Sequence, residues 1–226
     1  MAETGIHVFV LLRLLALLRF HFRDRMDSHY FAANMYLYYR EGQPKKRRAP
    51  DLMVIKGVDG RFERRSFKTW VEKAVPCFIL EATSKKTARE DQVEKKRVYE
   101  ELGVREYFLF DPLHEYLPEQ FLGYRLVGGH YERLPLGPGD CLISEELNMR
   151  FVPEGYNLLL FDMVTGQQLS APEEQVQELR DDLRGSRREL QETQVRLQET
   201  QEKLQEERNR REALAAELAR LKRKGR

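Results

Sequence analysis

The chain has 226 residues, of which 41% are hydrophobic and 34% charged, with a net charge of +2. This length suffices for one domain of ordinary size plus an extension, and so small a net charge excludes a surface that is basic throughout. Cys77 and Cys141 lie far apart without metal-ligand spacing, which excludes a disulfide scaffold and a zinc site and favours a reducing compartment.

The first predicted element is a helix over residues 6–25. Its apolar part, Ile6 to Phe20, is interrupted by Arg13 and Arg19 and falls short of a membrane span. No basic region precedes it and no small-residue cleavage site follows it, so the pattern does not fit a signal peptide. We therefore expect a buried core helix in a cytoplasmic protein without a membrane segment. A membrane or signal segment is the alternative interpretation.

The next elements are predicted to form a hairpin. Residues 30–39 (YFAANMYLYY) are rich in aromatic side chains, which is typical of a strand. Residues 40–49 (REGQPKKRRA) contain Gly and Pro and indicate a polar turn. Residues 52–56 then form the second strand, which Gly57 ends.

A strand, a helix and another strand follow in that order. Cys77 to Ala82 is almost continuously apolar, which predicts a central strand. Thr87 to Leu102 predicts a helix with an apolar side at Val93, Val98 and Leu102, and Gly103 is a suitable end for it. Residues 106–110 form the next strand. This order favours a parallel crossover, so we expect an α/β core with a mixed central sheet.

The rest of the core is predicted to be β-structure. Residues 123–134 (GYRLVGGHYERL) form a hairpin that turns at Gly128-Gly129. Residues 142–151 and 156–161 add strands, and the core ends near Leu169. We therefore divide the chain into a domain over residues 1–170 and an extension over residues 171–226.

The extension has the pattern of a coiled coil. Leucines or valine recur at one heptad position, and a repeat reads QETQVRL and then QETQEKL. The second heptad position is weaker, because Ser, Thr and Glu occupy several of its places. We expect a long helix that supports a homodimer or higher oligomer. A single solvated helix is the alternative.

The chemistry of the chain is concentrated between Pro50 and Asp111. Two apolar strands each carry one carboxylate at an edge, Asp51 before the first and Glu81 after the second. Carboxylates at neighbouring strand ends are suitable ligands for Mg²⁺, which activates water and stabilises charge in phosphodiester hydrolysis. Lys95 on the following helix could orient that water or balance charge. Three supporting residues are expected at the same site, namely Thr83, Asp91 and Tyr99.

Each of these residues also has an ordinary structural interpretation. Asp51 after proline is often part of a turn, and Glu81 could be an edge charge. Asp91 and Lys95 could form a surface i,i+4 pair. A basic run is more often a solvated loop than a phosphate-binding patch, and here the run is Lys45, Lys46, Arg47 and Arg48. The joint order and spacing therefore carry the prediction.

The order of these residues resembles that of the Uma-two family of endonucleases, a restriction-endonuclease-like branch of the PD-(D/E)XK nuclease superfamily. The matching residues are Pro50-Asp51 with LMVIKGV, Trp70 followed by Pro76, Glu81 with Thr83-Ser84 and Thr87, Asp91, Lys95, Tyr99, and GVREYFLFDP at 103–112. The later segments GYRLVGGHYERL and LLFDMVTG and the charged coiled-coil tail are also similar to that family. The resemblance covers roughly residues 6–170.

The resemblance implies a restriction-endonuclease-like fold, a mixed sheet flanked by helices. It also implies metal-dependent cleavage of nucleic acid, with Asp51 and Glu81 as ligands of Mg²⁺ or Mn²⁺ and Lys95 as the catalytic lysine. Two departures stand out. Superfamily members have a lysine two residues after the glutamate, whereas this chain has Thr83 at that position. The first helix also lacks the acidic residue that superfamily members often carry on it. Nearby lysines compete with Lys95 for the catalytic role, namely Lys85, Lys86 and Lys96.

We therefore expect an endonuclease that hydrolyses phosphodiester bonds of DNA. The alternative is an inactive module with the nuclease fold, which binds nucleic acid or has a regulatory role and oligomerises through its C-terminal helix. A third interpretation is an oligomeric scaffold whose function lies in the coiled coil.

Overall fold

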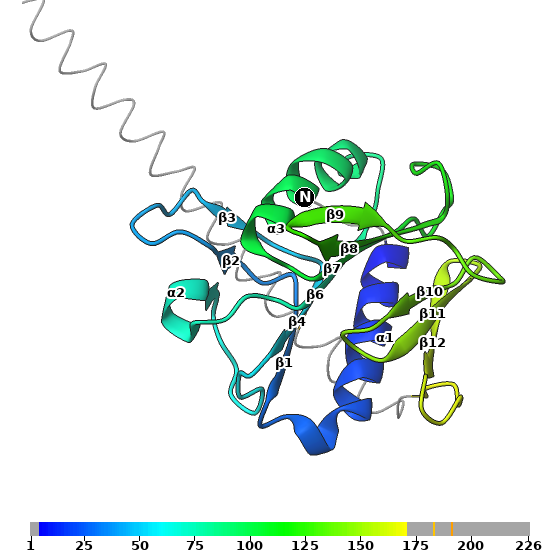
Figure 1. The fold of residues 1–226 in the computed structure, drawn as a ribbon, viewed down its shortest axis with the longest axis horizontal. Coiled ribbons are helices and arrows are strands. Elements are labelled where there is room, and N and C mark those ends of the chain that lie inside the picture. The colour runs from blue at the N-terminus through cyan, green and yellow to red at the C-terminus, as the bar shows by residue number, and fades with distance from the viewer. Residues whose placement is uncertain (1–4, 171–182, 184–190, 192–226) are drawn as a thin grey trace, which may run out of the picture. The chain divides into compact units, whose positions relative to one another are not determined.

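The structure is a computed structural model that describes residues 5–170, Leu183 and Gln191. The chain divides into two units, Met1–Val176 and Gln177–Arg226. The fold described below belongs to the first unit, shown in colour in Figure 1. The predicted coiled coil lies outside the described residues, and the domain boundary near residue 170 stays a prediction.

A mixed sheet of six strands forms the centre of the fold (Figure 1). Its order is β1 (His29–Ala33), β4 (Leu52–Lys56), β6 (Phe78–Ala82), β7 (Glu106–Phe110), β8 (Phe121–Val127) and β9 (His130–Arg133). Only β6 and β7 run parallel among these neighbours, and the other pairs are antiparallel. This confirms the mixed α/β class, the parallel crossover and the central position of the strand that ends at Ala82.

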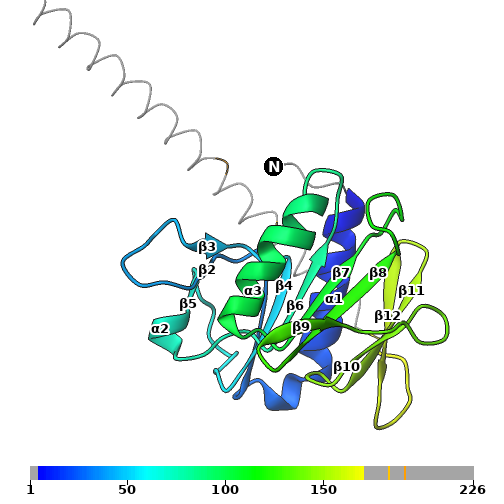
Figure 2. The same ribbon diagram turned by 45° about the horizontal axis from the view of Figure 1, so that its top comes forward.

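The sheet is covered on both faces, which explains why the middle strands β6 and β7 are mostly apolar and buried throughout. One face packs against α1 (Gly5–His21) and a second sheet of β10 (Leu142–Ser144), β11 (Met149–Glu154) and β12 (Asn157–Asp162). Phe151 of β11 contacts the rings of Phe78 and Phe108 there. The other face packs against Tyr99 of α3 (Lys96–Leu102). Figure 2 shows α1 and α3 on either side of the strands.

The first helix is shorter than predicted. It ends at His21, and a 3₁₀ turn, η1 (Arg23–Arg25), completes the predicted span. Its apolar side chains are buried almost all round, because the sheet lies on one side and β12 on another. Within residues 5–170, no helix is long and apolar enough to cross a membrane.

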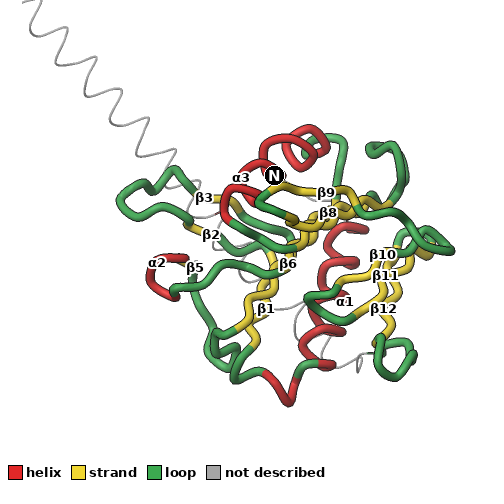
Figure 3. The backbone as a smooth tube through the Cα atoms, in the orientation of Figure 1, coloured by secondary structure: helices red, strands yellow, loops and turns green. Residues whose placement is uncertain are grey.

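The aromatic stretch 30–39 is not one strand, so that prediction was wrong. The chain leaves β1 at Asn34, whose φ of 51° lies in the left-handed region. It then forms a small separate sheet in the order β3 (Arg47–Arg48), β2 (Leu37–Tyr38) and β5 (Phe67–Lys68), followed by α2 (Thr69–Glu72). The predicted hairpin still exists, because β1 pairs with β4 in antiparallel register. Its connection is a folded excursion, drawn mostly as loop in Figure 3, and not a simple turn.

The central helix contains a widened turn. Residues Glu90–Lys95 form a π-helical segment, η2, that runs directly into α3. Val93 was predicted on the apolar side, but it is 60% exposed. Asp91 and Lys95 take the buried side of this turn. Segments of π-helix are rare and occur frequently at functional sites.

The hairpin of β8 and β9 forms as predicted. Its two turn residues, Gly128 and Gly129, have φ values of 58° and 89°. These positive values match the type I′ turns that suit the twist of antiparallel strands.

Candidate active site

Strand register brings the two predicted acids together. Leu52 pairs with Leu80 in the antiparallel β4–β6 ladder, so the next residues outward, Asp51 and Glu81, lie opposite each other. Two hydrogen bonds join Asp51 to the end of β6, one to Glu81 and one to Ala82. The Asp51 backbone N–H donates to Glu81 Oε2 at 3.1 Å, and the Ala82 N–H donates to Asp51 Oδ2 at 2.8 Å. The carboxylates therefore share one end of the sheet, on the face covered by η2 and α3.

Glu81 is completely buried and is held by three donors. The Tyr99 hydroxyl donates to Oε1 at 2.9 Å, while Oε2 accepts from the Asp51 backbone and lies 2.9 Å from Lys95 Nζ. A buried carboxylate is retained only when charge and hydrogen bonds compensate its lost hydration. The π-helical turn η2, helix α3 and the residue before β4 each supply one of these partners.

Lys95 lies between two carboxylates. Its Nζ is 2.8 Å from Asp91 Oδ1 as well as 2.9 Å from Glu81 Oε2. Both Lys95 and Asp91 are buried, at 8% and 1% exposure. The widened turn places them one above the other on the side that faces β6. This pair is therefore part of a buried cluster and not a surface i,i+4 pair.

The electrostatics of the cluster shift two pKa values in the same direction. Burial raises the pKa of Glu81 well above its ordinary value, Lys95 opposes the rise, and Asp51 and Asp91 add to it. Burial alone would lower the pKa of Lys95, but Glu81, Asp91 and Asp51 outweigh burial and raise it. Lys95 therefore keeps its proton at neutral pH, and acts as a cation and hydrogen-bond donor and not as a base.

The three predicted supporting residues lie in or beside this cluster. Asp91 pairs with Lys95, and Tyr99 binds Glu81. Thr83 is fully buried, and its Oγ1 has no hydrogen-bond partner among the described residues. As a side chain on the same strand face as Glu81, Thr83 offers a hydroxyl where the superfamily pattern has a lysine.

The competing lysines point elsewhere. Lys85 and Lys86 are exposed, and Lys96 Nζ lies 4.1 Å from the ring centre of Tyr124. Of the four lysines considered from the sequence, Lys95 alone pairs with Glu81 in the described part of the chain.

Two further contacts were missed by sequence reasoning. His7 on α1 is buried, and its Nε2 lies 3.0 Å from the backbone oxygen of Thr83. The Tyr107 hydroxyl on β7 donates to the backbone oxygen of Asp91 at 3.0 Å. Leu109 of β7 pairs with Glu81 of β6. Strand alternation could therefore have placed Tyr107, two residues before Leu109, on the face of the site. No local signal identifies His7, because its partner lies 76 residues away.

The donor set fits a divalent cation of the magnesium type. Three carboxylates, those of Asp51, Glu81 and Asp91, face one ammonium, so negative charge is in formal excess within the cluster. Their oxygens and the unpartnered Thr83 hydroxyl are hard ligands, which Mg²⁺ and Mn²⁺ prefer. Across residues 5–170, no group of three or more His, Cys, Asp or Glu side chains has the geometry of a complete metal site. Mg²⁺ commonly uses one or two carboxylates and takes its remaining ligands from water and phosphate.

The predicted basic patch lies on the connection between β1 and β4. Lys45, Lys46 and Arg47 are exposed, whereas Arg48 is half-buried beside η2. Within this run, the first three side chains are therefore open to solvent, whereas the fourth, Arg48, lies beside two glutamates of η2.

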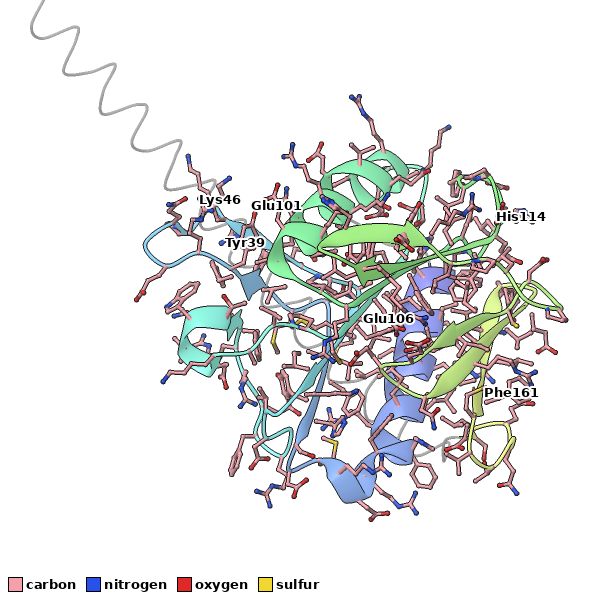
Figure 4. The ribbon with its side chains drawn as sticks, viewed as in Figure 1. Tyr39, Lys46, Glu101, Glu106, His114 and Phe161 are labelled. Carbon is pink, nitrogen blue, oxygen red and sulfur yellow. The ribbon has the colours of Figure 1, made fainter. Side chains whose placement is uncertain are left out.

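A second buried glutamate begins β7 and has a different environment. Glu106 accepts bonds from Arg125, from the Ser144 hydroxyl and from the backbone N–H groups of Glu145 and Glu146. Figure 4 labels it in the interior of the domain. Arg125 also donates to the exposed carboxylate of Glu145 at 2.6 Å, and the cluster joins β7, β8 and β10.

Comparison with known proteins identifies the family. The family model Uma2, described as "Putative restriction endonuclease", matches residues 1–152. One similar solved structure is the crystal structure of "a putative nuclease belonging to DUF820" from Anabaena variabilis ATCC 29413. It has 12% sequence identity and a TM-score of 0.47, and the match covers 65% of this chain and 76% of that chain. No curated protein matches the chain. Because the family model spans residues 1–152 of 226, the chain belongs to the Uma2 family.

Proposed function

We propose that this chain is a metal-dependent endonuclease that hydrolyses phosphodiester bonds of DNA. The observation that carries the proposal is the position of Lys95 Nζ, 2.9 Å from Glu81 and 2.8 Å from Asp91, at the strand end where Asp51 also lies. Family membership supports a nuclease, and the oxygen-rich donor set supports a divalent cation.

The proposed roles follow from the contacts of each side chain. Asp51 and Glu81 would hold Mg²⁺ or Mn²⁺, which when bound supplies an activated water and neutralises charge on the phosphate. Lys95 stays protonated and stabilises the extra negative charge that develops on the phosphate in the transition state. Tyr99 fixes the carboxylate plane of Glu81, and Asp91 holds Lys95 in position. Thr83 offers its hydroxyl to a water or a phosphate oxygen.

A cleavage assay tests the proposal. Single- and double-stranded DNA and RNA are incubated with the full chain and Mg²⁺ or Mn²⁺, with EDTA as the metal-free control. Asp51→Asn and Glu81→Gln should abolish cutting, whereas Glu154→Gln, a change at an exposed strand end, should leave it unaltered. If Asp51→Asn and Glu81→Gln cut as well as the parent, the site assignment is wrong.

A second candidate function is an inactive nuclease-fold module that binds nucleic acid. The observation in its favour is that both oxygens of Glu81 already accept hydrogen bonds or an ion pair from the protein. A Mn²⁺ titration separates the two candidates, because the inactive module would show no binding that depends on Asp51. Self-association through residues 173–226 belongs to this candidate, and light scattering on a deletion of that segment tests it.

A further inference from the structure

The connection between β1 and β4, residues 35–49, forms an arm that starts and ends beside the candidate active site. The Asn34 backbone N–H donates to the backbone oxygens of Pro50 at 3.0 Å and Asp51 at 3.2 Å. These bonds close the base of the arm at the residue that carries the site carboxylate. In Figures 1 and 2 the arm projects from the main sheet on the side of α3.

The outer part of the arm is strongly basic. Residues 40–47 are all exposed, and Arg40, Lys45, Lys46 and Arg47 outnumber the single acid, Glu41. Figure 4 labels Lys46 on this outer part. A local concentration of cations attracts polyanions even though the whole chain is almost neutral.

The arm also carries an arginine that lies against two tyrosine side chains. The guanidinium of Arg47 lies 4.4 Å from the ring centre of Tyr36 and donates to the Tyr38 hydroxyl at 2.9 Å. Tyr36 and Tyr38 are half-buried, and Arg47 is exposed on top of them. A guanidinium that is already oriented by an aromatic ring presents a planar cation on which a nucleobase can stack.

Arg48 anchors the arm to the site. Its guanidinium lies 4.0 Å from Glu90 and 3.9 Å from Glu94, both on the π-helical turn that carries Asp91 and Lys95. Arg48 also precedes Asp51 by only three residues, and three residues of fully extended chain span about 11 Å at most. Because acids already neutralise Arg48, the cations left for a ligand are those of the exposed tip.

We propose that this arm binds an unpaired nucleic-acid strand next to the cleaved phosphate. Lys45 and Lys46 contact phosphates, and the guanidinium of Arg47, held over Tyr36 and bonded to the Tyr38 hydroxyl, takes one base. The inference rests on the proposed function for what is done to the strand, but the binding itself needs no catalysis. An unpaired strand fits better than a duplex, because bases inside a duplex are stacked on each other and closed to a side-chain stack.

Binding is measured by fluorescence anisotropy of labelled oligonucleotides in EDTA, at several salt concentrations, in a full-length Glu81→Gln background. The test variant is Lys45→Ala/Lys46→Ala/Arg47→Ala. The control, Arg23→Ala/Arg25→Ala/Arg61→Ala, removes the same charge from exposed positions outside the arm. Thermal unfolding of each variant confirms that it is folded.

The test variant should lose at least about tenfold in affinity for single-stranded DNA. The slope of the logarithm of its affinity against the logarithm of the salt concentration should become shallower by about 2. The control should stay within about twofold of the parent. Arg47→Lys should keep the salt slope and lose about fivefold on single strands, because the charge remains and the planar stack is gone. Duplex DNA and single-stranded RNA are the comparison ligands.

Equal losses in the test and control variants would overturn the proposal, and so would an absence of any oligonucleotide binding. A test variant that loses duplex binding as strongly as single-strand binding would overturn the choice of an unpaired strand. Cleavage by the parent tests the proposed function separately. An arm that binds DNA in a chain that does not cut would refute the nuclease and leave this inference intact.

Discussion

Glu81 and Glu106 occupy opposite ends of the parallel pair β6 and β7, and both are buried, at 0% and 1% exposure. Glu106 is one buried carboxylate among donors, namely an arginine that it shares with the exposed Glu145, a hydroxyl and two backbone N–H groups. Glu81 shares a single lysine with Asp91 and lies opposite Asp51. Burial alone therefore does not distinguish a functional acid from a structural one. The balance of acids and donors does, because an excess of carboxylates is kept only where something else compensates it.

The largest expected difference between the two glutamates is in catalysis. Glu81→Gln should lower cleavage about 10³-fold or more, since it removes a proposed metal ligand and the partner of Lys95. Glu106→Gln should keep most of the cleavage rate at a temperature where the variant is folded. The measurement is the single-turnover rate on DNA with Mn²⁺. Comparable losses in both variants would contradict the distinction.

Stability should respond in the opposite order. Glu106→Gln removes the buried carboxylate that Arg125 binds and leaves that guanidinium only the exposed carboxylate of Glu145, so it should lower the free energy of unfolding by about 3 kcal/mol. Glu81→Gln should change it by less than about 1 kcal/mol, because relief of repulsion from Asp51 and Asp91 offsets the weaker contact with Lys95. Urea denaturation of both variants measures these values. A larger loss in Glu81→Gln would mean that its cluster is primarily structural.

Addition of metal should sharpen the comparison. Mg²⁺ at about 100 times its dissociation constant should raise the free energy of unfolding of the parent by about 2.7 kcal/mol, since it binds the folded state alone. Glu106→Gln should be stabilised equally, and Glu81→Gln should not respond. Thermal unfolding with and without Mg²⁺ gives the answer, and Ca²⁺ serves as a control for general screening. Stabilisation of Glu81→Gln by Mg²⁺ would place the metal elsewhere.

The smallest effect is a pH dependence that Glu81 alone should produce. Its pKa is raised in the folded state, so the folded chain binds this proton more tightly than the unfolded chain. The stabilisation is present below the ordinary pKa of 4.5 and is lost as pH rises from there towards the raised value. Relative to Glu81→Gln, the metal-free parent should lose up to about 1.4 kcal/mol per pH unit in this interval. A difference that grows with pH would show that Lys95 dominates and lowers the pKa.

Much of this comparison could be predicted from sequence. The apolar runs ending at Lys56 and Ala82 identify two strands, and Asp51 and Glu81 at their edges identify the end that carries the acids. The fixed alternation of strands then orients Thr83 and Glu81 to one face. The central helix was found from its length and from Gly103, whose φ of 80° is the usual left-handed end.

The remaining features depend on contacts distant in sequence. His7 reaches Thr83 across the fold, and Glu106 gathers donors from β8 and β10, so no local spacing reports either contact. The break at Asn34 is hidden because aromatic residues continue on both sides of it. Val93 was misplaced because buried polar residues, Asp91 and Lys95, replace the apolar stripe in that turn. Hydrophobic periodicity fails where a helix turns charge towards the core.

The π-helical turn has a consequence for how this site can change by mutation. Each residue of an ordinary α-helix advances by about 100° around the axis. Deleting one residue between Asp91 and Lys95 would let the turn tighten to α-helical geometry, in which the two side chains, then three residues apart, would lie about 60° apart around the axis. The strands and the core residue Tyr99 could keep their places while the position of Lys95 between Asp91 and Glu81 changed. A single-codon deletion would thus separate fold from site more cleanly than most substitutions.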